Sequence, residues 1–98
     1  MALYKSNYPD GFVSNSTPSV ISILGVIIET FTISATDISN GYVDLSGTPN
    51  SIATLALDWE GIDQYQGVDY TVSINRIYFM TNLLNNLDTG DLIKVSYQ

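Results

Sequence analysis

The sequence contains no cysteine and no histidine, and only 13% of its 98 residues are charged. Without cysteine there can be no disulfide bond, so the redox compartment is left undetermined. Without histidine the chain lacks the usual general base and the commonest metal ligand. A small monomer relies on surface charge for solubility, so this low share of charge indicates that a partner covers part of the surface.

Positive charge is especially scarce, because Lys5, Arg76 and Lys94 stand against ten acidic residues and the net charge is −7. Nucleic-acid binding requires clustered Lys and Arg that release counterions from the phosphates. An anionic membrane surface attracts the same residues. Three scattered cations form no such cluster, so we expect neither a nucleic-acid partner nor a membrane partner.

Long hydrophobic runs are also missing. The longest, residues 20–28, is interrupted by Ser22 and Gly25 and falls far below the roughly 20 residues of a transmembrane helix. It follows nineteen mostly polar residues with a single lysine, which match a secretion signal poorly. We expect synthesis in the cytoplasm and one domain, because a chain of this length has no room for two cores.

Catalytic groupings are not recognisable. No Ser or Thr has a neighbouring base that could activate it as a nucleophile, and there is no glycine-rich phosphate loop. Asp58, Glu60 and Asp63 surround Trp59 at a spacing that could suit a hard cation. The EF-hand pattern is absent, however, and a solvated hairpin tip is the better explanation of these residues. We therefore expect no enzymatic activity, no cofactor and no metal.

The chain does contain a series of short apolar strands from Phe31 to Tyr97. Val43 and Leu45 alternate with polar neighbours, as in a half-buried strand. Further strands are expected at 52–59, 68–73, 76–80 and 92–97, and one or two helical turns at 82–88. Short strands with frequent Gly, Pro and Asn turns predict an all-β fold. We expect a small antiparallel β-sandwich, Ig-like or jelly-roll-like, with an extended N-terminal arm.

Residues 20–28 are apolar on both faces of a strand. One face would carry Val20, Leu24, Val26 and Ile28, and the other Ile21, Ile23 and Ile27. A strand that is apolar on both faces is buried on both, so we expect one face to complete the core and the other to contact another subunit. After Glu29 the alternation predicts a half-exposed strand with Phe31, Ile33 and Ala35 apolar.

The first nineteen residues show no alternation, and Pro9-Asp10-Gly11 is a turn signal. They are predicted to form an extended arm, 1–19, ahead of a β-domain, 20–98. A disordered terminus is the alternative, but disordered segments are poor in aromatic residues. We therefore predict an arm that docks on a partner. The predicted interface consists of Tyr4, Tyr8, Phe12, Ile21, Ile23, Leu24, Val26 and Ile27.

Most of the seven tyrosines lie in predicted strands, whereas Tyr65 falls in a loop and Trp59 ends a predicted strand at the edge of that loop. Aromatic side chains in loops suit sugar stacking and protein contacts, because a ring adds contact area at low entropy cost. Together with Asp58 and Glu60 they form a candidate ligand loop. A carbohydrate-binding module that uses Trp59 and Tyr65 is therefore one alternative function.

Two sets of residues resemble proteins of tailed-phage virions. Residues 33–49, followed by 67–72 and 90–95, are similar to a small β-sandwich module of phage fibre, tail and capsid-associated proteins. Residues 6–12, with 21–26 behind them, resemble an N-terminal attachment peptide of some phage head-fibre and tail proteins. The first similarity covers about two thirds of the chain and the second is short.

The resemblance implies a virion structural protein, either a capsid decoration (cement) protein or a short head fibre that docks through its N-terminal region. A tail or baseplate component is the alternative within this class. The implied partners are the major capsid protein or other virion proteins, and further copies of the chain in a homo-oligomer. The family usually has glycine where this chain has Ile74. A β-branched residue resists positive φ, so we expect Asn75 to adopt it.

Overall fold

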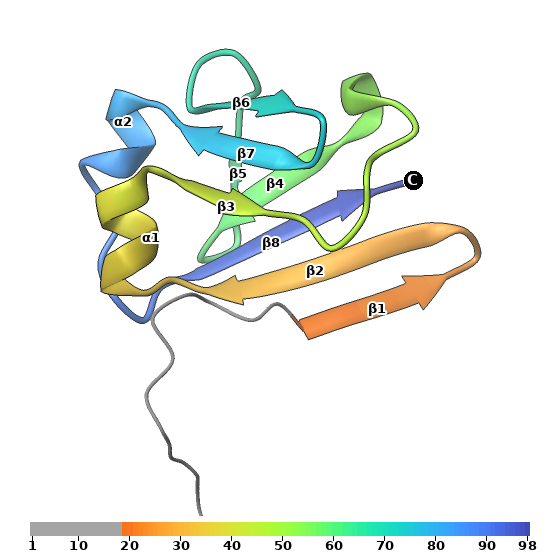
Figure 1. Ribbon diagram of the computed structural model, residues 1–98, viewed down its shortest axis with the longest axis horizontal. Helices are drawn as coiled ribbons and strands as arrows, with labels where there is room; N and C mark the ends of the chain where they lie inside the picture. The colour runs from red at the N-terminus through yellow and green to blue at the C-terminus, as the bar shows by residue number, and fades with distance from the viewer. Residues whose placement is uncertain (1–18) are drawn as a thin grey trace, which may run out of the picture.

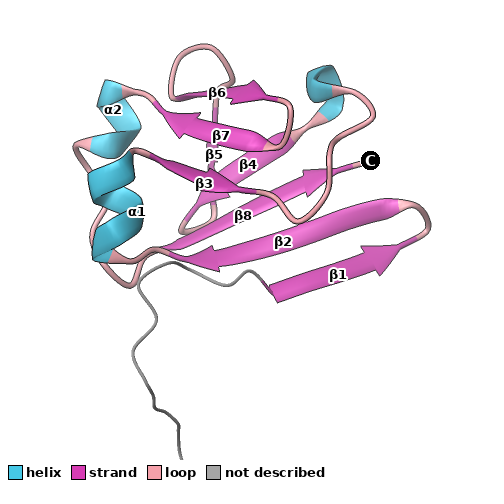
Figure 2. Ribbon diagram, viewed as in Figure 1, coloured by secondary structure: helices cyan, strands magenta, loops and turns pink. Residues whose placement is uncertain are grey.

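The computed structural model describes residues 19–98, so the predicted arm with Tyr4, Tyr8 and Phe12 lies outside the described residues. Two antiparallel sheets pack around one core (Figures 1 and 2), which confirms the predicted all-β, sandwich-like fold. The elements are β1 (Ser19–Ile23), β2 (Val26–Thr32), α1 (Ala35–Asn40), β3 (Tyr42–Asp44), the 3₁₀ turn η1 (Ile52–Thr54), β4 (Ala56–Trp59), β5 (Ile62–Gln64), β6 (Tyr70–Ser73), β7 (Arg76–Phe79), α2 (Thr81–Leu84) and β8 (Leu92–Tyr97).

The larger sheet has the strand order β1-β2-β8-β4-β5 and the smaller sheet the order β3-β7-β6. Strands β1 and β5 are therefore the two edges of the larger sheet. In Figure 1 the helices α1 and α2 lie at the left-hand end of the sandwich, and η1 lies at the other end. The β1–β2 hairpin runs along the lower side and ends on the right, away from the helices.

The core is formed by alternate residues of the central strands. Val43 and Leu45 are buried as predicted, and Ile77, Ile93 and Val95 have no exposed surface. Burying a side chain of this kind stabilises the fold by about 1.5–3 kcal/mol. The remaining core consists of Phe31, Ile33, Leu55, Leu57, Tyr70, Phe79, Leu83, Leu87 and Tyr97.

Helix α1 is the largest departure from the predicted strands, because the alternation from Phe31 to Ala35 predicted a strand and β2 ends at Thr32. The Ser34 hydroxyl accepts the backbone N–H of Asp37 at 3.1 Å, and the Asp37 carboxylate accepts that of Ser34 at 2.9 Å. This capping box starts the helix. Gly41 ends it with φ of 79°.

Two further predictions are corrected. The segment 52–59 is not one strand, because η1 precedes β4 and only residues from Ala56 onward pair with neighbours. In the β6–β7 turn Ile74, rather than Asn75, has positive φ, at 59°. The Asn75 side-chain amide donates to the carbonyl of Leu45, and the Leu45 N–H donates to the carbonyl of Asn75. These two bonds hold Asn75, so Ile74 makes the unusual turn.

Candidate functional site

The segment 20–28 is a hairpin, and the prediction of one strand buried on both faces is wrong. The chain reverses at Leu24-Gly25, whose φ values are 52° and 83°. Two consecutive positive φ values are what a type I′ turn requires. The register places Ile23 opposite Val26 and Ile21 opposite Ile28. Gly25 was a turn signal in the sequence, but leucine is not a turn residue and the apolar run concealed it.

The reversal changes which side chains share a face. Residues directly opposite each other in an antiparallel pair point to the same face. Glu29 and Phe31 are buried between the sheets, so the intervening residues of β2, Ile28 and Thr30, point outward. Four apolar residues therefore project from the outer face of the larger sheet and form the outer apolar patch: Ile21, Ile23, Val26 and Ile28.

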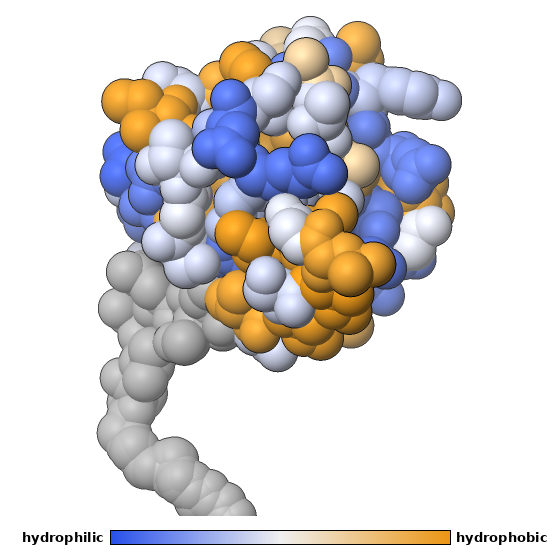
Figure 3. Space-filling view, turned by 90° about the vertical axis from the view of Figure 1, so that its right-hand side faces the viewer, coloured by the Kyte–Doolittle hydropathy of each residue, from blue (hydrophilic) through white to orange (hydrophobic). Residues whose placement is uncertain are grey.

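The hairpin is open to solvent where it ends. Every residue of β1 is exposed, with Ile21 at 52%, Ile23 at 55% and the turn residue Leu24 at 98%. Figure 3 looks at the right-hand side of Figure 1 and shows hydrophobic surface gathered at the height of the hairpin. Exposed contiguous apolar patches mark interaction sites in soluble proteins. The hairpin is thus the strongest candidate for a contact surface.

Leu24 carries two energetic costs at one position. A left-handed backbone costs a non-glycine residue about 1–2 kcal/mol, and the apolar side chain is held in water. Asn in the same place would fit the turn without either cost. Residues held in unfavourable backbone conformations cluster at functional positions. Ile74 combines the same features, with φ of 59° and 73% exposure, so what distinguishes Leu24 is its place at the end of the outer apolar patch.

The predicted interface residues within the described chain fall into two groups. Ile21, Ile23 and Leu24 are exposed, and Val26 is half-buried at the edge of the same patch. Ile27 points the other way and packs against the core. The sequence could not separate Ile27 from the others, because only the position of the turn assigns each residue to a face.

A buried carboxylate fixes the base of the hairpin, although no sequence signal indicated it. Glu29 is fully buried and accepts the backbone N–H of Ser46 at 3.0 Å, the Ser46 hydroxyl at 2.9 Å and the Tyr97 hydroxyl. Burial, and then the adjacent Glu29 carboxylate, raises the pKa of Tyr97. Glu29 thus joins β2 to β8 and to the loop after β3, so the exposed hairpin extends from an anchored base.

The fold separates the two aromatic residues of the candidate ligand loop, Trp59 and Tyr65. Trp59 pairs with Ile62 beside the β4–β5 turn, whereas Gln64, next to Tyr65, pairs with Leu57 at the other end of that hairpin. Trp59 packs against the core, and its indole N–H donates to the Asp91 carboxylate at 3.0 Å. The half-buried indole therefore does not combine with Tyr65 into one platform.

Two carboxylates of this segment, Asp58 and Glu60, have partners within the protein. Asp58 lies 3.7 Å from the ammonium of Lys94, and Glu60 accepts the backbone N–H of Leu92 at 2.6 Å. Within residues 19–98 no group of three or more Asp, Glu, His or Cys residues is placed to hold a metal ion. Asp58 and Glu60 thus connect β4 and its turn to β8.

Tyr65 instead lines a groove of about 330 Å³ beside β4 and β5. Its side chain is 69% exposed, and the groove wall also contains Asp63, Gln64, Gln66 and the buried Tyr70. Burial raises the pKa of Tyr70. The groove was not found from the sequence because its wall combines residues from η1 to β6.

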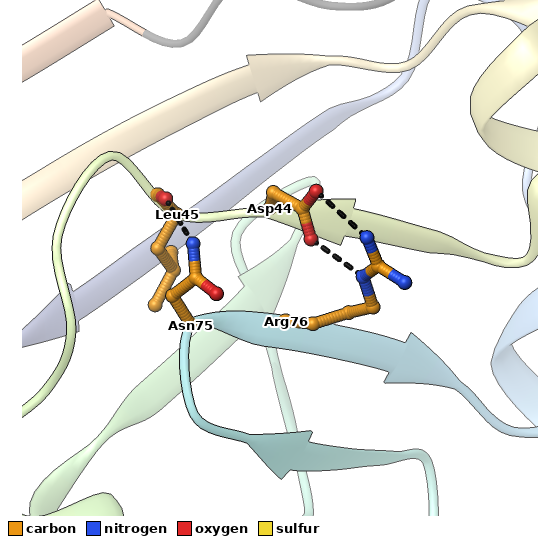
Figure 4. Close-up of polar contacts among 4 residues, drawn as sticks. All are labelled: Asp44, Leu45, Asn75 and Arg76. Atoms are coloured by element: carbon orange, nitrogen blue, oxygen red, sulfur yellow. Dashed lines mark hydrogen bonds and ion pairs between the residues drawn. The ribbon is translucent and has the colours of Figure 1, made fainter.

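The outer face of the smaller sheet holds one of the three cations. Arg76 donates to both carboxylate oxygens of Asp44, at 2.7 and 3.1 Å, beside the Asn75–Leu45 hydrogen bond (Figure 4). Its guanidinium carbon lies 3.9 Å from the ring centre of Tyr42. Hydrogen bonding to Asp44 raises the pKa of Arg76 above its usual value. This cation is therefore already paired with a carboxylate.

No helix among residues 19–98 has the length and apolar character to cross a membrane. No protein-family model matches the chain, and neither a curated protein nor a solved structure is detectably similar to it. Its function is therefore inferred from its own sequence and surface.

Proposed function

We propose that this protein is a structural component of a tailed-phage virion, a capsid decoration protein or short head fibre, and that it docks through the β1–β2 hairpin. The virion assignment rests on the resemblance of residues 33–49, 67–72 and 90–95 to phage structural modules. Docking rests on one observation: Ile21 and Ile23 of the outer apolar patch are exposed, and the patch ends in the exposed turn residue Leu24.

The chemistry of the hairpin suits burial against protein. From Ser19 to Ile28 it carries no charged side chain, so docking does not require the desolvation of a charge. Fully burying an Ile or Leu side chain contributes on the order of 1.5–3 kcal/mol. The costs of association are subtracted from this gain. The matching partner is an apolar groove or sheet face of the major capsid protein or another virion protein.

The test is incorporation into particles. A phage that encodes this chain is deleted for the gene and supplied with the chain in trans, and copies per purified particle are counted by quantitative mass spectrometry. Ile23→Asp is compared with Ile62→Asp, which changes a similarly exposed isoleucine on the opposite edge strand, β5. Both variants add one negative charge, so they differ only in position.

The unmodified chain and Ile62→Asp should be incorporated equally, and incorporation of Ile23→Asp should fall about tenfold or more, the factor for roughly 1.4 kcal/mol. Equal incorporation of both variants would refute docking through the hairpin. Absence of the unmodified chain from particles would refute the virion assignment. A density map of the particle then separates a capsid position from a tail or baseplate position.

Carbohydrate binding is the second candidate, and the groove beside Tyr65 favours it. An exposed ring next to carboxamide and carboxylate groups offers both stacking and hydrogen bonding to a sugar. Trp59 does not contribute its ring, since that ring packs against the core. A glycan array with the unmodified chain and Tyr65→Ala tests this role. Binding that Tyr65→Ala abolishes supports it, and no binding by the unmodified chain contradicts it.

A further inference from the structure

Strand β1 offers unused backbone groups as well as apolar side chains. Within residues 19–98 no strand pairs with its outer edge. Residues that flank a two-residue turn exchange both backbone hydrogen bonds, and such pairs alternate along an antiparallel ladder. Ile23, and with it Ile21, is therefore bonded to β2. The N–H and C=O groups of Val20 and Ser22 point away from the sheet.

This edge lacks the features that usually prevent edge pairing. Proteins protect open edges with Lys, Pro, inward-pointing charges or bulges. Strand β1 has none of these between Ser19 and Ile23, and its register with β2 runs without a bulge. The opposite edge strand, β5, differs because it contains Asp63. The edge of β1 can therefore accept another strand.

We propose that β1 pairs in antiparallel fashion with β1 of a second copy of this chain, about a twofold axis at Ile21. Val20 of each copy then exchanges two backbone hydrogen bonds with Ser22 of the other. The two Ile21 residues face each other as a non-hydrogen-bonded pair. The contact closes on itself, as an isologous dimer interface must, and joins the two larger sheets into one.

Charge favours a second copy at this edge over other contacts between copies. Each chain carries a net charge of −7, so two copies repel each other through most of their surfaces. The hairpin has no charged side chain from Ser19 to Ile28, and the buried Glu29 is bonded to Ser46 and Tyr97. Pairing through β1 brings the uncharged hairpins together and keeps the remaining, acidic parts of the two copies on opposite sides of the contact.

The pairing would enlarge the proposed docking surface, and its functional role rests on the proposed function. In the dimer the two outer apolar patches become continuous, because the Ile21 side chains meet at the axis. A partner protein would therefore meet one doubled patch. Two five-residue edges bury less than the roughly 800 Å² per partner of a standard interface. The free dimer is accordingly weak, with a Kd on the order of 10–100 μM.

The experiment uses the absence of cysteine from the chain. Ile21→Cys places two thiols opposite each other at the axis, where the Cα atoms of a non-hydrogen-bonded pair are about 4.5 Å apart. This separation lies within the range of disulfides. Leu24→Cys is the control, because residue 24 is 98% exposed and residue 21 only 52%. Random collision would thus favour cross-linking at residue 24.

Under mild oxidation, Ile21→Cys should form the disulfide-linked dimer about tenfold faster than Leu24→Cys, because pairing raises the effective thiol concentration. Equal rates, or a faster Leu24→Cys, would overturn the proposal. Amide exchange of the unmodified chain provides a check without substitution. Exchange at Val20 and Ser22 should slow as protein concentration rises, and unchanged exchange would contradict pairing. These results leave docking to virion proteins unaffected, so the two proposals fail separately.

Discussion

Isoleucine side chains occur both in the core and on the β1–β2 hairpin, in opposite surroundings. Ile77 and Ile93 have no exposed surface, whereas Ile21 and Ile23 are more than half exposed. All four lie in strands, so residue type and secondary structure do not separate them. What differs is the second layer: the central strands face another sheet, and the outer face of the hairpin does not. The core isoleucines stabilise the fold, and those of the hairpin remain available to a partner.

The largest expected difference is in unfolding free energy when the two kinds of isoleucine are truncated. Ile93→Ala removes packing at a fully buried position and should cost about 4 kcal/mol. Ile23→Ala should change the free energy of unfolding by less than about 1 kcal/mol, because its side chain is already half solvated. Urea denaturation below the dimer Kd measures both. Similar losses would show that the hairpin belongs to the core.

The second-largest effect is expected at Glu29, which anchors the hairpin to the core. Glu29→Ala leaves the buried Tyr97 hydroxyl and the Ser46 N–H without their acceptor, which should cost about 3 kcal/mol. Glu60→Ala is the matched control, because this carboxylate is exposed and its removal should cost less than about 1 kcal/mol. Urea denaturation compares them. If Glu29→Ala cost no more than Glu60→Ala, the buried network would not anchor the hairpin.

Alkaline pH should lower the free energy of unfolding through two buried tyrosines. Tyr97 and Tyr70 have raised pKa values in the folded protein, chiefly because of burial. Below pH about 10, the unfolded pKa, each tyrosine is protonated in both states and contributes its full stabilising effect. As pH rises from there toward the folded pKa, the free energy of unfolding should fall by up to about 1.4 kcal/mol per pH unit for each tyrosine, because only the unfolded state loses the proton. Urea denaturation at several pH values in this range should show that the free energy of unfolding of Tyr97→Phe falls less steeply with pH than that of the unmodified protein. An equal slope in both proteins would contradict this role of Tyr97.

The smallest effect concerns the turn residues. Leu24→Asn should stabilise the fold by about 1 kcal/mol, because asparagine accepts the left-handed backbone that leucine resists. Ile74→Asn should give a similar gain for the same reason. Only Leu24→Asn should lower incorporation into particles, since it removes a side chain of the proposed docking surface. Equal incorporation of the two variants would show that Leu24 makes no contact.

The fold was largely predictable because alternation and turn residues act locally. Val43, Leu45 and the strand 92–97 followed from side-chain period alone. The capping box of α1 was present in the sequence, but its six-residue helix is too short for helical periodicity to reveal. The site was only partly predictable. The sequence predicted Ile21, Ile23 and Leu24 as contact residues, and the structure leaves them exposed. Their common surface depends on the Leu24-Gly25 turn, which forms against the preference of leucine.

The most direct test of the proposed docking is hydroxyl-radical footprinting of the protein, free and bound to purified particles of the proposed phage. If the hairpin is the docking surface, Ile21, Ile23 and Leu24 should lose most of their reactivity on assembly. Ile62 and Tyr65, which are similarly exposed in the free protein, should keep theirs. Unchanged reactivity of the hairpin in the particle, with protection at Ile62 and Tyr65 instead, would contradict the account.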